Sequence, residues 1–165
     1  MQRNFKSTYF FKYFKTKHCS VINTSEGEAI FGSEYTEKEH AITHRQERVD
    51  GIYTTDCRFT STDGQNTISV IARLGENPDS MKAEFELERK QLEDPGMSGE
   101  GRKPETTNDI GDQAHWTSAK GLVPGSLGVL KGKNILYVTV DGFGQDNTLM
   151  LGKAKALAEK TFAKL

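Results

Sequence analysis

Long hydrophobic runs, proline and net charge are all scarce in this sequence. No apolar run approaches the roughly 18 residues that a transmembrane helix needs, which excludes a protein that crosses a membrane by helices. Four prolines among 165 residues, with 27% charged residues, do not fit a wholly disordered chain. The net charge of −1 gives the molecule as a whole no attraction to polyanions, so nucleic acid is not an expected partner.

What is present is enough for one hydrophobic core. Hydrophobic residues make up 35% of the chain, and 165 residues is the length of a single domain. At this size, folding buries about 70% of the surface that the unfolded chain exposes. We therefore expect one domain over residues 19–165, preceded by a segment 1–18 of different composition.

The segment 1–18 is basic and aromatic. It holds five Lys and Arg residues and no acid, so the remaining 17 basic and 23 acidic residues give residues 19–165 a charge of −6. Lysines interrupt each of its apolar stretches, so it does not match a signal peptide as it stands. Three alternatives remain open: packing of its rings on the core, a disordered or processed leader, or an arm that contacts a membrane surface or nucleic acid.

A short helix is expected near the start of the domain. Ser25 and Glu28 have the spacing of a capping box, in which each side chain bonds to the other residue's backbone N–H. Gly32 follows the last helical residue and supplies the stop. The sequence therefore predicts a helix over about residues 24–31.

Two longer helices are expected further along the chain. One begins at Asn77, which can cap it, followed by a proline that suits the first turn, and it ends before Pro95. The other covers residues 146–165. Its predicted buried stripe consists of apolar residues at helical spacing: Leu151, Ala154, Ala158, Phe162 and Leu165.

Alternating apolar and polar residues predict strands. Residues 53–60 and 67–74 flank an Asp-Gly pair and form a predicted antiparallel hairpin. Residues 95–107 hold three glycines and two prolines and are expected to form an exposed loop. Further strands are expected in four places: 40–49, 109–118, 127–131 and 134–140.

The order of these elements predicts the fold class. Strands are joined mainly by hairpins, and helices lie between groups of strands rather than between every pair. We therefore predict an α+β domain, in which an antiparallel β-sheet of about five to six strands is packed by two long helices and one short N-terminal helix.

The two cysteines leave the compartment open. Cys19 and Cys57 are 38 residues apart, too far for a CxxC redox or zinc pair. A disulfide between them would contribute roughly 3–4 kcal/mol in the chain-entropy model and would imply an exported protein. Two free thiols would instead imply the cytosol.

Two histidines are weak candidates for metal binding. His40 and His44 have a spacing that places them on one side of a helix or a strand. The zinc-protease pattern also requires Glu after the first His, and Ala41 occupies that position. Gly142-Phe143-Gly144 lacks the third glycine of a dinucleotide motif. We therefore expect no metal and no cofactor.

Three stretches resemble small bacterial exported, lipoprotein-like domains of unknown function. They are Cys19–Gly32, the strand that opens at Cys57, and Gly111-Asp112-Gln113-Ala114-His115-Trp116, which is similar to a Gly-Asp-x-Ala-x-Trp motif. The resemblance implies a PsbP-like α+β fold, a Cys19–Cys57 disulfide and an extracytoplasmic location, in the periplasm or cell envelope. It supplies no catalytic residues.

The third stretch provides the candidate ligand-binding residues. Gly111 and Asp112 can form a turn before a strand that carries Trp116, which would then anchor the terminal helix. The functional alternative is a ligand pocket walled by His115 and Trp116, with Asp112 beside it.

The sequence favours a binding domain over an enzyme. No stretch has the spacing of a catalytic motif, so we predict a non-catalytic exported or cell-envelope domain that binds a protein, lipid or small ligand through its sheet face or the 95–107 loop. The first alternative is a small hydrolase or metal-dependent enzyme that uses His40, His44 or His115. The second is a cytosolic adaptor whose basic residues 1–18 contact anionic partners, including a membrane surface.

Overall fold

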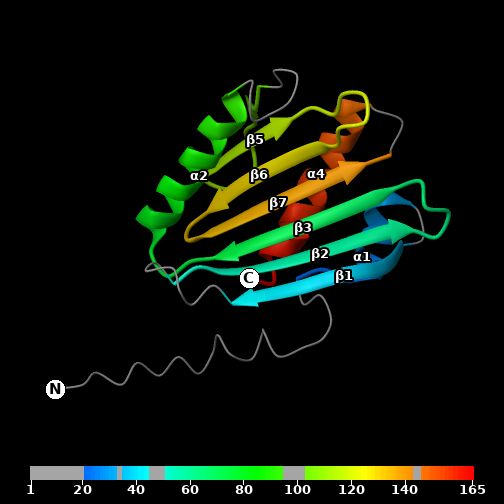
Figure 1. The fold of residues 1–165 in the computed structure, drawn as a ribbon, viewed down its shortest axis with the longest axis horizontal. Coiled ribbons are helices and arrows are strands. Elements are labelled where there is room, and N and C mark those ends of the chain that lie inside the picture. The colour runs from blue at the N-terminus through cyan, green and yellow to red at the C-terminus, as the bar shows by residue number, and fades with distance from the viewer. Residues whose placement is uncertain (1–20, 33–34, 45–50, 95–102, 143–145) are drawn as a thin grey trace.

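One antiparallel sheet organises the whole described structure. The computed structural model describes residues 21–32, 35–44, 51–94, 103–142 and 146–165, with the backbone alone for 35–44. Seven strands follow the spatial order β1-β2-β3-β7-β6-β5-β4 (Figure 1). Their bounds are β1 Tyr35–His44, β2 Tyr53–Ser61, β3 Thr67–Leu74, β4 Glu105–Thr106, β5 Gln113–Thr117, β6 Gly125–Lys131 and β7 Asn134–Asp141.

The α+β class and the antiparallel sheet are confirmed. Six strands have at least five residues, and β4 adds a seventh of only two residues. The prediction of an irregular loop over 95–107 is wrong at Glu105 and Thr106, because their backbones pair with Trp116 and His115 at the sheet edge. The strand predicted over residues 40–49 begins earlier than expected: it covers Tyr35–His44 and forms one edge of the sheet.

Three helices accompany the sheet: α1 Thr24–Phe31, α2 Pro78–Glu93 and α4 Asn147–Phe162. The predicted cap of α2 is confirmed, since the Asn77 side chain accepts hydrogen bonds from two backbone N–H groups of the first turn. The predicted capping box of α1 is wrong by two residues. Asn23 and Glu26 form it instead of Ser25 and Glu28, and they satisfy each other's backbone N–H groups at 2.9 and 3.0 Å.

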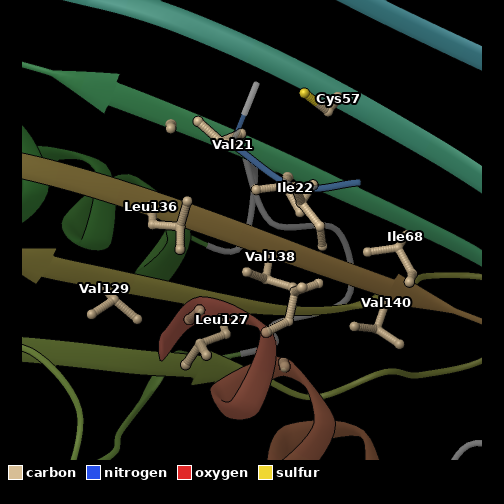
Figure 2. Close-up of a cluster of buried hydrophobic side chains, with 14 of the residues drawn as sticks. Val21, Ile22, Cys57, Ile68, Leu127, Val129, Leu136, Val138 and Val140 are labelled. Carbon is tan, nitrogen blue, oxygen red and sulfur yellow. The ribbon is translucent and has the colours of Figure 1, made fainter. Parts of the chain in front are cut away.

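One face of the sheet is covered by α1 and α4. On the central strand β7, Leu136, Val138 and Val140 alternate onto this face and are fully buried. Figure 2 shows Val21 and Ile22, which precede α1, lying over the same sheet face as Cys57 and Ile68. Each fully buried side chain of this kind contributes about 1.5–3 kcal/mol, so this layer supplies most of the apolar burial.

The buried stripe of α4 differs from the predicted one. Ala154 and Ala158 are buried as expected, and Leu151 and Phe162 are partly buried against the same core. Met150 and Leu157 are fully buried although they were not predicted, and Leu165 is exposed. Lys153, expected on the outer face of α4, donates from Nζ to the carbonyl oxygens of Ile30 and Phe31 at 3.0 and 3.4 Å and so satisfies carbonyls at the C-terminus of α1.

The opposite face of the sheet is covered only in part, by α2. Met81 and Phe85 of α2 pack on Leu130 and Ile135 in a second, smaller cluster. Figure 1 shows α2 at one end of β5, β6 and β7, with β2 and the far half of β3 left beyond it. The half of this face over β2, β3 and the end of β7 therefore has no described helix on it. No helix in the described ranges has both the length and the apolar content to cross a bilayer.

Replacing Gly128 tests the packing beneath α2. An added Cβ would lie 2.6 Å from Cε1 of His115 and 3.1 Å from a ring carbon of Tyr137, so a packed ring must move. We expect G128A to lower the free energy of unfolding by about 1–3 kcal/mol in urea denaturation.

The matched control for this variant is G152A, in α4. No atom of the described residues lies within 4 Å of a Cβ added at Gly152, so this variant should be neutral or more stable by up to about 1 kcal/mol. Equal stability of G128A and the parent protein would contradict the close approach of the two rings.

Candidate functional site

The predicted ligand residues His115 and Trp116 lie on opposite faces of the sheet. They are adjacent in β5, and successive side chains of a strand point in opposite directions. Trp116 is in the large core under α4, whereas His115 contacts Phe85 of α2. One pocket walled by both rings therefore does not form, and this expectation is corrected.

Trp116 is placed as a core residue. Only 3% of it is exposed, and a Cβ added at Gly125 on the neighbouring strand would lie 2.4 Å from its ring. The glycine therefore makes room for the indole. The ring shares its cluster with Met150 and Ala154 of α4, which is the anchoring position expected for the structural alternative.

His115 is sealed beneath α2. It is 2% exposed, its ring centroid lies 5.0 Å from that of Phe85, and its Nδ1 has no hydrogen-bond partner among the described residues. Burial, reinforced by the positive charge of Arg89, lowers the pKa of His115 to about 4. The imidazole is therefore neutral at ordinary pH, and its burial keeps it from acting as a general base towards a bound substrate.

Asp112 has a structural role in a tight turn. Its Oδ2 accepts a hydrogen bond from the Gly132 N–H at 2.6 Å, and its own N–H donates to the Leu130 carbonyl at 2.7 Å. Gly111 before it has φ +65°, and a Cβ there would lie 2.5 Å from the Leu130 oxygen, so only glycine fits. The Gly-Asp pair is therefore explained by the backbone geometry.

A first cavity adjoins Asp112. It has a volume of about 380 Å³ and lies between α2 and residues 106–114. Glu86 and Arg89 of α2 line it, and they pair with each other at 3.3 Å. Asp109, with φ +72°, and Asp112 face them across the cavity. The single basic residue of this lining, Arg89, is therefore paired with Glu86, and the remaining charged residues of the lining are acidic.

A cluster of charged and aromatic groups joins α2 to the sheet strands beneath it. Arg73 contacts Glu84 and Glu88 of α2, and its guanidinium lies 5.6 Å from the ring centre of Tyr137. The Tyr137 hydroxyl donates to Glu88. Burial and the Glu88 carboxylate raise the pKa of Tyr137, so the phenol keeps its proton. This cluster fixes α2 on the sheet.

A second hollow lies on the half of the sheet that α2 leaves uncovered. Its volume is about 500 Å³. The residues that line it are polar except for one proline, and they come from β2, β3, β7 and the position just before β6: Arg58, Thr60, Thr67, Ser69, Pro124, Thr139 and Asp141. We call this site the polar hollow. The alternation over residues 53–60 predicts that Arg58 and Thr60 share one face of the hairpin, opposite Cys57, but no sequence motif marks a site there.

The predicted metal ligands are not tested by the structure. The backbones of His40 and His44 pair with Cys57 and Tyr53, but their side chains are not described. Across the described residues, no three His, Cys, Asp or Glu side chains are grouped as metal ligands would be. Cys57 is fully buried and no free cysteine occurs in the described part of the chain, while Cys19 and the segment 1–18 lie outside it.

Acidification tests the neutral state of His115. Burial lowers its pKa from 6.5 to about 4 in the folded protein, so the unfolded chain takes up this proton more readily. The contribution of the neutral His115 ring to the free energy of unfolding is fully present above about pH 6.5 and is lost as the pH falls towards 4. We expect this group to remove about 3 kcal/mol of stability over that range.

The matched variant for this test is H115Q, which should flatten the pH dependence of urea denaturation between about pH 6.5 and 5. An NMR titration of the His115 ring in the parent protein checks the same point without a variant. A midpoint near 6.5 would contradict the burial effect.

Two substitutions of Asp112 separate its turn contact from any other role. D112A removes the acceptor for the Gly132 N–H and should lower the free energy of unfolding by about 0.5–1.5 kcal/mol. D112N keeps an acceptor oxygen and should recover most of this loss in the same denaturation measurement. If D112A is as stable as the parent, the turn contact contributes nothing.

Comparison with known proteins gives a fold relationship. No protein-family model matches the chain, and no curated protein matches it significantly. Among solved structures, the extracellular domain of PknH from Mycobacterium tuberculosis is similar, with a TM-score of 0.58 and 11% identity over 86% of this chain and 92% of that one. This chain therefore shares the fold of a bacterial extracellular α+β domain.

Proposed function

We propose that this chain is an exported, non-catalytic domain that binds a ligand through the open half of its sheet. The polar hollow is the observation that carries the proposal. Its floor is made of strand residues whose positions are fixed by backbone pairing on both sides of β3. A rigid sheet that presents several polar side chains in a hollow is suited to recognition of a ligand.

The position of Cys57 supports the export part of the proposal. Val21 and Ile22 pack in the same buried cluster as Cys57, and Figure 2 shows Val21 on the side of the sheet where Cys57 lies. No free cysteine occurs among the described residues, which include Cys57. Cys19 is the only other cysteine of the sequence, so a disulfide within this chain would be the Cys19–Cys57 bond.

The fold similarity supports the same compartment. The matched structure is described as an extracellular domain, and an exported α+β domain of this length would meet the same oxidising environment. The sealed position of His115 counts against the alternative of an enzyme that uses this residue as a base. We therefore favour binding over catalysis.

Intact mass with and without reduction tests the compartment. In protein produced in an oxidising compartment and unfolded without reductant, alkylation should add nothing, whereas alkylation after reduction should add two groups. Reduction should also lower stability by about 3–4 kcal/mol, because the loop between the two cysteines is released. Two alkylated thiols before reduction would favour the cytosolic adaptor.

A ligand screen by NMR tests the binding part. Mixtures of short peptides, neutral oligosaccharides and anionic lipid vesicles are added to the full chain, and backbone shifts are followed. We expect shifts at β2, β3 and the end of β7 around the polar hollow, with Gly152 on α4 as an internal control that stays unmoved. Shifts confined to other surfaces would contradict the proposed site.

A further inference from the structure

The polar hollow has opposite charges at its two ends. Arg58 pairs in register with Ser69, and Ser69 pairs with Thr139. One row further along, Thr60 pairs with Thr67, and Thr67 pairs with Asp141. Arg58 and Asp141 are therefore at diagonal corners of a small grid, with hydroxyl groups between them.

The register gives the length of this diagonal. The two corners are two strand spacings apart across the sheet and two residues apart along it, which is about 12 Å between Cα atoms. An extended peptide spans about 3.3–3.6 Å per residue, so a chain of three or four residues matches this length.

The hydroxyl groups of the grid differ in their availability. Ser69 Oγ donates to Asp56 Oδ1 at 3.3 Å, and Thr139 Oγ1 lies 3.3 Å from Ser126 Oγ. Thr60 and Thr67, between the two charged corners, make no side-chain hydrogen bond with another described residue. Each can donate and accept one, as the amides of a bound peptide require.

We propose that the polar hollow binds short zwitterionic peptides of three or four residues, with the terminal carboxylate at Arg58 and the terminal ammonium at Asp141. This proposal rests on the proposed function and names its ligand class. A guanidinium can hold a carboxylate through two parallel hydrogen bonds, and a carboxylate accepts charge-assisted bonds from an ammonium group. The Thr60 and Thr67 hydroxyls bond to the peptide backbone between them.

Other ligand classes fit the lining less well. A simple anion would contact only the Arg58 end and a simple cation only the Asp141 end, so neither would use both charges of the hollow. No aromatic ring is among the residues that line the hollow, so a sugar has no flat apolar surface to stack on. Pro124 is the only apolar side chain of the lining, which leaves little for a lipid tail.

Binding of trialanine and tetraalanine to the full chain, measured by NMR titration, tests the proposal. We expect the free peptides to bind and expect acetylation of the amino end or amidation of the carboxyl end to weaken binding by about tenfold each. R58Q should weaken binding of the free peptide by a similar factor and should not change the affinity for the amidated peptide. D141N should likewise weaken binding of the free peptide and should not change the affinity for the acetylated peptide.

Matched controls keep the result specific. R89Q removes an arginine from the other cavity, and D79N removes an acid from the first turn of α2, so neither should change peptide affinity. Urea denaturation of each variant checks that the fold is retained. If doubly capped peptides bind as well as free ones, or if R58Q and D141N have no effect, the proposal is wrong.

The outcome also separates this proposal from the proposed function. Shifts around the polar hollow with oligosaccharide or vesicles, but not with free peptides, would overturn the peptide assignment and leave the binding surface in place. No shift around the hollow with any of these probes would overturn both.

Discussion

The alternation of side chains along β3 and β7 determines what the rest of this molecule can do. One side of these central strands is continuously apolar and is closed by α1 and α4. On the other side, β7 is apolar under α2 and becomes polar towards Thr139 and Asp141. A sheet buried on both faces would need apolar residues throughout. The polar end of the second face therefore requires contact with water or with a ligand, and this is where the hollow lies.

The fold class and the hairpins could be predicted because their signals are local. Period-two alternation, Asp-Gly turns and the Asn77-Pro78 helix start depend on a few neighbouring residues. Details that depend on distant contacts could not be predicted. The inward position of Lys153 depends on carbonyl groups of α1, more than 120 residues earlier.

The candidate site was missed for a related reason. Arg58 and Asp141 lie far apart in the sequence, and each is typical of a solvated strand position when taken alone. Only the placement of β7 beside β3 brings them onto one surface. The predicted ligand motif has a structural explanation at each position: Gly111-Asp112 forms a turn, His115 is a buried imidazole, and Trp116 is a core residue.

The connection between α1 and α4 has a consequence for the order of folding. Lys153 of α4 holds the C-terminus of α1, and β3 pairs with the much later strand β7. Such distant pairings slow folding, because early segments wait for partners that are synthesised much later. The large core is therefore completed only after α4 has been synthesised, and the apolar faces of α1, β2 and β3 stay exposed to water until then.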